Sequence, residues 1–548
     1  MALASFLIFW RINYTDIIGD DGHYSFRAVG LTDWLLSEAQ STPLHWFDTL
    51  PWWSYLSFHD HPLALFVIQH IFFAFGVSTF AAKLPFTLFG LGTICLTYAW
   101  VKNHFNEKIA LASALLITVS ANFIALARRP LMETGVMFFL ALALYYFVLF
   151  LKDQKYWWKL GLALGFLVQV KLTVLFIFPT LISYLLLQPT LRKNKTIWKS
   201  MAKISGIIGI FAVPTLIYEV MMYKTQGHFS YQYARLLGQD SPWQAGGVSF
   251  SFFHSFGSLF NQWLHWYSIP FIIAVLIGIT YCLYRINYQA SLPLLGLFWL
   301  TIQDLLIGAK DSYALFFPVI LALAFYAAKE KITSPMGQKI FSLTGKVFIL
   351  YLFIYTANSI IVFKNHGPVG WLRTQTEPTN YGLYQLDAYL DEITVKALAN
   401  KEVDNLDVYS TEKQKHFFLR NFFAPDKVLD NGDNAMKNII VYDSNLQWFA
   451  RTWIYARRLV YDNLLFISTK NLPGLIKDLG YTPRIYYFIK TQPGTLLESP
   501  DFSDENATVM ENGLISYNIK PEKIIYRADG VEAFRIYHIK DKLSFLFE

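Results

Sequence analysis

The sequence predicts a polytopic α-helical membrane protein with a soluble α/β domain at its C-terminus. Of its 548 residues, 54% are hydrophobic and only 16% are charged, whereas soluble domains carry about 25% charged residues. Many apolar runs approach the roughly 20 residues that a helix needs to cross a bilayer. After about residue 364, shorter strand-like and helix-like runs replace them. We therefore predict a membrane domain over 1–363 and a soluble domain over 364–548.

The long apolar runs predict about eleven membrane spans. Every second loop between these spans is rich in Lys and Arg, so these loops share one side of the membrane. The positive-inside tendency predicts that this side is the cytoplasm. The loops at 14–80, 128–134, 223–265 and 309–311 then share the outer face of the cytoplasmic membrane with the C-terminal domain. The predicted spans are 2–13, 81–101, 109–127, 135–151, 157–171, 172–188, 203–222, 266–286, 290–308, 312–328 and 346–363.

The apolar run "HPLALFVIQHIFFAFG", 61–76, needs a separate interpretation. Counting it as a span would place every later cationic loop outside. We interpret it as a helix that lies at the outer interface, one of two juxtamembrane helices in the first outer loop. The aromatic-rich segment before it, 45–58, suits the same layer.

The C-terminal domain is predicted from alternating elements. Strand-like runs are "NLDVYS", "NIIVYDS" and "RIYYFIK", and helix-like runs are "YQLDAYLDEITVKAL", "LQWFARTWIYARRLVY" and "LPGLIKDL". A closing hairpin, "IIYRADGVEAFRIYHI", turns at Asp529-Gly530. Roughly 180 residues are an ordinary size for one such domain.

Charge and cysteine content exclude several classes of protein. The net charge of +7 is explained by cytoplasmic loops, and no basic–aromatic module predicts nucleic-acid binding. The two cysteines, Cys95 and Cys282, both lie in apolar runs. This position argues against a disulfide framework and against a cysteine zinc site.

The predicted outer face gathers the polar residues that chemistry would need. The acidic pair Asp20-Asp21 opens the first loop, and a carboxylate can accept a proton from a hydroxyl. Arginine and lysine can hold a phosphate. Each residue also has a structural explanation: carboxylates cap helices, and arginines reach toward lipid headgroups. Two histidines that flank one aspartate rarely face a single ion, so "HDHP" is not predicted to bind metal. The other polar residues on this face are Tyr24, His59, Asp60, His61, Arg128, Arg129, Glu133, Lys171, His228, Tyr231, Arg235, Lys310, Asp311 and Tyr313.

Five segments in order resemble the motifs of one family. "DDGHY" resembles the D-E-x-x-Y motif of GT-C glycosyltransferases of the protein-mannosyltransferase and lipid A aminoarabinose-transferase type. The others are "FHDHPLALFVIQHIFFAFGVSTFAAKLPFTLFGLGTI", "ALARRPLMETGVMFFLALALYYF", "LGFLVQVKLTVLFIFP" and "AKDSYALFFPVILALAF". The resemblance covers roughly 14–190 and 305–328.

This chain departs from the family pattern at several positions. Asp21 stands for the usual Glu, Lys83 for the usual Arg, and Glu133 for the usual Asp. His61 is followed by one proline where the family often has two. The W-W-D motif of oligosaccharyltransferases is absent, which argues against transfer of an oligosaccharide block onto asparagine.

The resemblance implies an inverting glycosyltransferase that moves a monosaccharide from a polyprenyl-phosphate carrier to a hydroxyl of a glycolipid, glycan or protein. Asp20 is expected to be the general base, with Asp21 beside it and Glu133 as its orienting partner. The expected donor-binding residues are Arg128 (with Arg129 as the register alternative), Lys171, Lys310 and Tyr313. The expected substrate-binding residues are Tyr24, His59, Asp60, His61, His228 and Tyr231. No cofactor is implied, and a need for a divalent metal stays open.

Other functions would also place charge at a membrane. A flippase or transporter of lipid-linked sugars would show intramembrane charge, but no paired repeat is found in the sequence. A non-catalytic receptor or assembly factor would act through the outer domain alone. A glycan polymerase with another motif order is a further enzymatic alternative.

Overall fold

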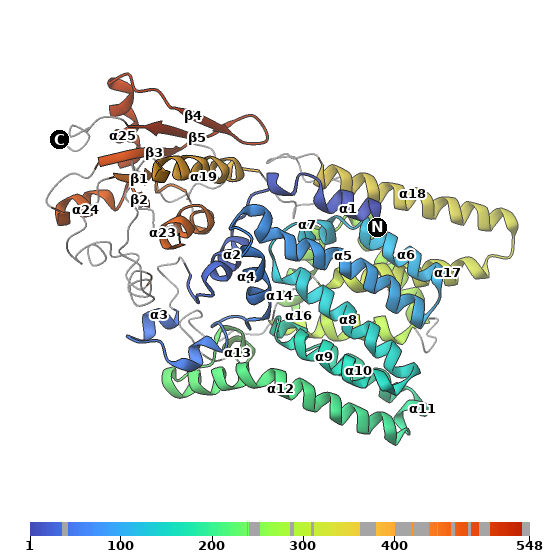
Figure 1. Ribbon diagram of the computed structural model, residues 1–548. Coiled ribbons are helices and arrows are strands. Elements are labelled where there is room, and N and C mark those ends of the chain that lie inside the picture. Colours follow the sequence, from blue (N-terminus) through green and yellow to red (C-terminus); the bar gives the residue numbers. More distant parts are fainter. Residues whose placement is uncertain are drawn as a thin grey trace.

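Long apolar helices form the body of the computed structural model, and a mixed β-sheet with its own helices lies at one end of this body (Figure 1). The structure describes residues 1–35, 42–237, 239, 252–284, 290–307, 312–361, 380–399, 419, 438–446, 448–461, 466–479, 484–492 and 505–539. The predicted domain boundary at 363–364 lies outside these residues.

Within the described residues, five helices are long and apolar enough to cross a bilayer. At a rise of about 1.5 Å per residue, a 20-residue helix covers the roughly 30 Å of hydrocarbon. The chain is therefore a multi-pass membrane protein. The five are α5 (Thr79–His104), α8 (Met132–Lys152), α12 (Lys195–Gln226), α17 (Tyr313–Lys331) and α18 (Pro335–Ile360).

The segment predicted as one span at 109–127 is bent. Helices α6 (Glu107–Thr118) and α7 (Ala121–Ala127) meet at 68° and together count as a sixth candidate span. The break is stabilised from α18, where the Thr356 hydroxyl donates to the Val119 carbonyl at 2.7 Å. A side-chain donor of this kind replaces the helical hydrogen bond that the bend removes.

Several other predicted spans are shorter in the structure than in the sequence pattern. Helix α1 (Ala2–Phe9) has eight residues, and Arg11 then turns into a left-handed conformation with φ 44°. The remaining helices of the body are α9 (Trp157–Val168), α10 (Ile177–Leu187), α11 (Pro189–Arg192), α13 (Tyr231–Leu236), α14 (Phe252–Trp266), α15 (Ile269–Tyr284) and α16 (Ser291–Ile307). Short 3₁₀ turns are η1 (Ile12–Tyr14), η2 (Trp52–Tyr55), η3 (Gln154–Tyr156) and η4 (Leu172–Val174).

The loop at 14–80, which we call the first outer loop after its predicted side, contains α2 (Asp20–Gly30), α3 (Pro43–Trp46) and α4 (Ala64–Phe73). Helix α4 forms from ten residues of the run at 61–76. Its length of about 15 Å is too short to cross a bilayer. One of its faces is buried, while Val67 and Ile71, and Phe75 just beyond the helix, are 40%, 56% and 88% exposed. An apolar face left open in this way suits a helix at the membrane interface.

The C-terminal unit, which we define as α19 (Leu383–Ala399) with residues 438–539, is built on a five-stranded sheet in the order β2-β1-β3-β5-β4. Strands β1, β2 and β3 are parallel, and β5 and β4 form an antiparallel hairpin. Its strands are β1 (Asn438–Tyr442), β2 (Phe466–Ser468), β3 (Arg484–Thr491), β4 (Lys523–Tyr526) and β5 (Glu532–His538). Its other helices are α22 (Trp448–Arg451), the π-helical turn η6 (Thr452–Ala456), α23 (Arg457–Tyr461), α24 (Leu472–Leu479) and α25 (Glu505–Ser516).

The sequence pattern predicted most of these elements correctly. Strands β1 and β3 and helices α19 and α24 lie within a residue or two of their predicted positions. The hairpin turns where expected, with Gly530 at φ 84° and the Arg527 amide donating to the Val531 carbonyl at 2.9 Å. Glycine allows that left-handed conformation without steric cost. The predicted strand "NLDVYS" lies outside the described residues.

Buried polar contacts attach the C-terminal unit to the membrane body. Asp387 of α19 accepts from the Thr79 hydroxyl at the start of α5 (3.0 Å) and pairs with Arg457 (3.0 Å). Asp16 of the first loop accepts from the backbone amides of Tyr381 and Tyr384, before and at the start of α19. These buried contacts bring the C-terminal unit against the first outer loop.

Candidate functional site

Helix α2 carries the acidic pair at its N-terminus. Gly19, at φ 63°, precedes the helix and turns the chain into it. Asp20, Tyr24 and Arg27 are spaced by four and three residues, so they share one face. The helix dipole favours the two carboxylates at the N-terminus of α2.

Asp21 is fully buried and is paired with Arg129. The guanidinium of Arg129 donates through Nε (2.8 Å) and Nη2 (3.0 Å) to the two oxygens of the carboxylate. Bidentate pairs of this kind fix orientation as well as charge. Arg129 keeps 28% of its side chain exposed, so it can also reach a ligand beside α2.

Asp20 has a different environment. Its side chain is exposed to solvent and makes no hydrogen bond or ion pair within the described part of the chain. Protein groups still crowd around it, and this desolvation, followed by the negative charge of Glu133, raises the pKa of the Asp20 carboxyl. The cations Lys171 and Arg129 oppose that rise. Asp20 is therefore an available carboxylate with increased proton affinity.

Glu133 and Lys171 form the neighbouring ion pair. Glu133 lies in the first turn of α8, and Lys171 precedes η4. The Lys171 ammonium donates to Glu133 Oε1 at 2.5 Å, and the two side chains are 6% and 16% exposed for Lys171 and Glu133 respectively. The structure thus brings together five of the residues predicted from sequence, namely Asp20, Asp21, Arg129, Glu133 and Lys171.

The loop before α4 contacts the same face of α2. The Tyr24 hydroxyl lies 3.0 Å from His61 Nε2, and Arg27 Nη1 donates to Asp60 Oδ1 at 2.7 Å. Burial lowers the pKa of His61 to about 3, so this imidazole is neutral near pH 7. Burial alone would raise the pKa of Asp60, but the charge of Arg27 holds it well below its usual range.

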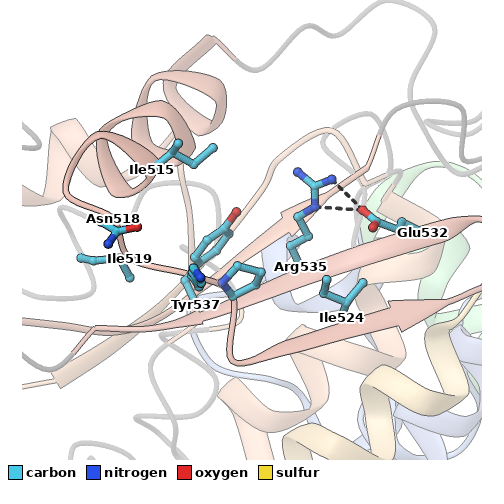
Figure 2. A pocket seen from close by; sticks show the side chains of 9 residues that line it. Ile515, Asn518, Ile519, Ile524, Glu532, Arg535 and Tyr537 are labelled. Atoms are coloured by element: carbon cyan, nitrogen blue, oxygen red, sulfur yellow. Dashed lines mark hydrogen bonds and ion pairs between the residues drawn. The ribbon is translucent and has the colours of Figure 1, made fainter.

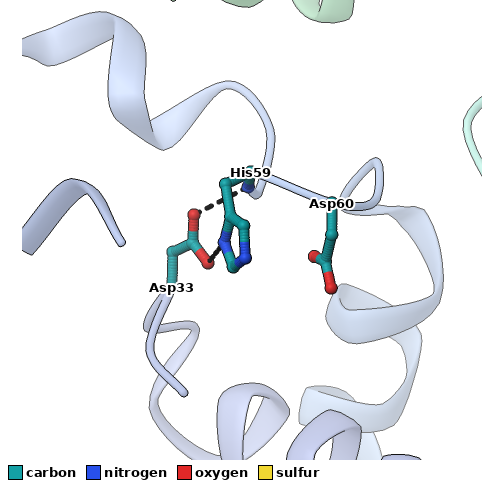
Figure 3. A group of neighbouring side chains, drawn as sticks. All are labelled: Asp33, His59 and Asp60. Atoms are coloured by element: carbon teal, nitrogen blue, oxygen red, sulfur yellow. Dashed lines mark hydrogen bonds and ion pairs between the residues drawn. The ribbon is translucent and has the colours of Figure 1, made fainter. Parts of the chain in front are cut away.

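Asp33, His59 and Asp60 lie together at the far end of this face (Figure 3). His59 Nδ1 is 2.6 Å from Asp33 Oδ1, and the His59 backbone amide donates to Asp33 Oδ2 at 2.7 Å. Ligating atoms of the three residues lie within 4.8 Å of one another. Arg27 already balances the charge of Asp60, so protein groups satisfy much of this cluster.

The other predicted site residues have different partners. Arg128 is fully buried, and its Nη1 donates to the Leu7 and Ile8 carbonyls at 2.8 and 3.1 Å at the end of α1. Tyr313 is buried between Trp263 and Phe317. His228 packs against Trp46, and the Tyr231 amide donates to the His59 carbonyl at 3.0 Å. Lys310 and Asp311 lie outside the described residues, as does the Arg235 side chain.

Two residues of the site were missed in the sequence. Arg27 follows Asp20 and Tyr24 at helical spacing, and this periodicity is the signal that could have revealed it. Asp33 follows the end of α2, where Leu31 adopts a left-handed conformation with φ 48°. No local pattern links Asp33 to His59, because the two residues meet only through the fold.

The structure has a pocket beside α2 and another in the C-terminal unit. One, of about 270 Å³, lies beside the C-terminal end of α2 and is lined largely by apolar residues that include Leu31, Phe58 and Leu63. The other, of about 340 Å³, lies in the C-terminal unit between the end of α25 and the β4–β5 hairpin, where Arg535 pairs with Glu532 (Figure 2). Its lining residues are Ile515, Asn518, Ile519, Lys520, Pro521, Ile524, Glu532, Arg535 and Tyr537, so it is separate from the carboxylates of α2.

Comparison with known proteins agrees with the predicted resemblance. Residues 60–218 match the family model described as dolichyl-phosphate-mannose-protein mannosyltransferase. No curated protein matches the sequence. Among solved structures, ArnT from Cupriavidus metallidurans bound to undecaprenyl phosphate aligns with 98% of this chain and 96% of its own, at 12% identity and a TM-score of 0.51.

An oligosaccharyltransferase from Archaeoglobus fulgidus, in complex with zinc and sulfate, aligns with 89% of this chain and 67% of its own, at 12% identity and a TM-score of 0.49. Because its TM-score is below 0.5, we base the likeness in fold on the ArnT structure. With the family match over 60–218 and a shared fold over nearly the whole chain, the resemblance to GT-C glycosyltransferases of the protein-mannosyltransferase and aminoarabinose-transferase type is confirmed.

Proposed function

We propose that this protein is an inverting glycosyltransferase that moves a monosaccharide from a polyprenyl-phosphate carrier to a hydroxyl acceptor at the outer membrane face. The observation that carries the proposal is an available carboxylate, Asp20, close to two cations, Arg129 and Lys171, which are themselves held by Asp21 and Glu133. A general base and a phosphate-binding group are the two functions that such a transfer requires.

The chemistry balances with these groups alone. Asp20 accepts the proton of the acceptor hydroxyl as the acceptor oxygen bonds to the anomeric carbon of the sugar. The bond between that carbon and the phosphate oxygen breaks, and polyprenyl phosphate leaves. Arg129 and Lys171 stabilise the negative charge that develops on the leaving phosphate. Glu133 holds Lys171 in place through their 2.5 Å contact.

A polyprenyl-phosphate donor fits the surroundings of the site. The long apolar helices set the protein in a bilayer, whose hydrocarbon can hold the prenyl chain, and the ArnT structure with the similar fold is bound to undecaprenyl phosphate. Arg128, placed on the α1 carbonyls, leaves the phosphate to Arg129 in this proposal. Lys310 and Tyr313 stay predicted donor ligands, and His59, Asp60, His61, Tyr24, His228 and Tyr231 stay predicted substrate contacts.

The test uses purified protein in detergent with a panel of radiolabelled undecaprenyl-phosphate monosaccharides and membranes from cells that lack the gene. We expect label to move from one of these donors to a membrane component, with an equal release of undecaprenyl phosphate. Asp20→Asn keeps the shape of the side chain but removes the base, and we expect about 100-fold slower transfer.

Other outcomes separate the alternatives. Unchanged transfer by Asp20→Asn would exclude Asp20 as the base. Movement of an intact labelled donor across a vesicle membrane without release of undecaprenyl phosphate would instead show a flippase. A protein that shows neither transfer nor movement of donor, yet binds other envelope proteins through the C-terminal unit, would be a non-catalytic factor.

A further inference from the structure

One face of α2 is covered by the C-terminal unit. Segments α22, η6 and α23 form one continuous helix, Trp448–Tyr461, and each of the three lies against α2 (Figure 1). Phe26 packs on Tyr461 with ring centroids 5.0 Å apart. A Cβ atom at Gly30 would lie only 2.4 Å from Cε1 of Tyr461. Glycine at position 30 is therefore what allows this close approach.

A second face of α2 is held by α4. Gln69 Nε2 donates to the Ser25 hydroxyl at 3.0 Å, and His70 Nδ1 lies 2.9 Å from the Ala28 carbonyl. The face with Asp20, Tyr24 and Arg27 is turned to the site. With two faces bound by neighbours, the position of Asp20 depends on both α4 and the helix Trp448–Tyr461.

The helix Trp448–Tyr461 is itself held firmly. Trp453 stacks on Phe73 of α4 with centroids 6.1 Å apart, and Arg457 lies over the Trp453 ring at 4.4 Å. Arg458, fully buried, donates to the Asp387 carbonyl at 2.7 Å and to Asp391 at 2.5 Å. The π-helical turn η6 lies between Trp448 and Tyr461, and such turns occur often at functional sites. The helix is thus a rigid support and not a loose cover.

We infer that Tyr461 is a positioning residue for transfer: its ring, packed on Phe26 and Gly30, holds α2 so that Asp20 faces the acceptor hydroxyl. This inference rests on the proposed function. Tyr461 touches neither donor nor acceptor, and it acts through α2. Displacement of a base by about 1 Å can slow an enzyme on the order of 100-fold, so a contact at the far end of the helix matters.

The test exchanges volume between the two contacting residues. Gly30→Ala places a methyl group against the Tyr461 ring, and Tyr461→Ala removes the ring. We expect each single variant to lower kcat for transfer on the order of 10- to 100-fold, while the Kd for undecaprenyl phosphate stays within about twofold. The double variant Gly30→Ala with Tyr461→Ala relieves the clash, and we expect its kcat to exceed that of Gly30→Ala.

Two controls complete the design. Tyr461→Phe keeps the ring, so near-normal kcat is expected. Tyr517→Ala removes a tyrosine that is 58% exposed on the same unit, and no change is expected. If a single variant fails to fold, Tyr461→Phe and the double variant still report on the contact. The inference would be overturned if Tyr461→Ala and folded Gly30→Ala both kept full kcat. It would also be overturned if the double variant transferred sugar no faster than Gly30→Ala.

Failure of the inference is distinguishable from failure of the proposed function. If wild-type protein transfers sugar and Asp20→Asn does not, the function stands whatever the Tyr461 variants do. If wild-type protein transfers nothing, the function itself fails before the contact is tested.

Discussion

At the residue scale, adjacent carboxylates in this protein have opposite surroundings. Asp21 is buried and neutralised by a bidentate arginine, whereas Asp20 next to it is exposed and has no hydrogen bond within the described residues. Desolvation raises the pKa of both carboxyls, but both oxygens of Asp21 already accept from Arg129, whereas those of Asp20 are open to an acceptor hydroxyl. The two adjacent arginines differ in a similar way. Arg128 is buried on backbone carbonyls, whereas Arg129 is partly exposed beside Asp20.

Substitution of the two arginines tests this contrast. Arg129→Ala removes a cation from the site, and we expect the affinity for undecaprenyl phosphate to fall by about 1.5–3 kcal/mol, measured by equilibrium binding in detergent. Arg128→Ala leaves the Leu7 and Ile8 carbonyls without their donor, and we expect a loss of about 1–3 kcal/mol of stability, seen as a lower thermal midpoint. The reverse result would move the phosphate site to Arg128.

The pH dependence of transfer follows from Asp20. Its pKa is raised above 3.8 by desolvation and by Glu133, and a general base must be deprotonated to act. We expect transfer to rise with pH along an acidic limb whose midpoint lies above 3.8. Lys171→Met removes a cation that lowers this pKa, so its limb should shift to higher pH. A limb that shifts to lower pH would mean that another group titrates.

At the element scale, α2 is held at both ends and along two faces by elements distant in sequence. Its N-terminal end is fixed by Arg129, and its C-terminal end packs on Tyr461. Helix α4 is anchored to α2 through Gln69 and His70. Loops that carry function usually need rigid neighbours of this kind. The first outer loop is therefore a structured platform on which the carboxylates are held.

The contact between the first loop and α19 predicts a pH effect on stability. Burial raises the pKa of Asp16 from 3.8 to about 7, although the amides of Tyr381 and Tyr384 oppose that rise. A carboxyl whose pKa is raised on folding stabilises the fold below about pH 4, and this contribution is lost as pH rises through about 7. We expect the thermal midpoint of wild-type protein to fall between pH 5 and pH 8.

Asp16→Asn isolates this contribution. The amide oxygen still accepts a backbone hydrogen bond but carries no charge, so the midpoint of the variant should depend less on pH over the same range. Glu505→Gln, an exposed carboxylate in α25, should retain the wild-type dependence. Equal pH dependence in Asp16→Asn and wild-type protein would assign the titration to another residue.

At the scale of the whole molecule, sidedness decides whether the parts can work together. Helix α2, which carries the carboxylates, meets the C-terminal unit at one end of the helical body (Figure 1). The positive-inside tendency predicts that loops rich in lysine and arginine, such as 189–203, face the cytoplasm, and α11 within this segment lies away from the C-terminal unit (Figure 1). A transferase at the outer face requires the first outer loop and the C-terminal unit to share the outer compartment.

Cysteine labelling in intact cells tests this arrangement. In protein without Cys95 and Cys282, single cysteines at Thr49 and Ser516, both exposed, should react with a membrane-impermeant thiol reagent. A cysteine at Thr196, exposed at the start of α12, should react only after permeabilisation. Labelling of Thr196→Cys in intact cells, with Ser516→Cys protected, would invert the topology and contradict the proposed outer-face reaction.

The sequence by itself determined the class of protein, the acidic start of α2, the short helix at 61–76 and most strands of the C-terminal sheet. These features depend on local composition, periodicity and turn residues such as Gly530, which a single stretch of chain contains. The family resemblance likewise depends on residues in order along the chain. The sequence predicted that Asp20, Asp21, Glu133 and Lys171 share the outer membrane face, and the structure brings their side chains close together.

Only the tertiary structure decided which side chains are partners. Arg128 and Arg129 are adjacent and chemically identical, and the direction of the chain after α7 sends one to α1 and the other to Asp21. Asp33 meets His59, and Gly30 meets Tyr461, across long separations in sequence. At the bend near Val119, a hydroxyl from α18 binds the backbone carbonyl. Such contacts depend on packing between distant segments, and no local pattern in the chain encodes them.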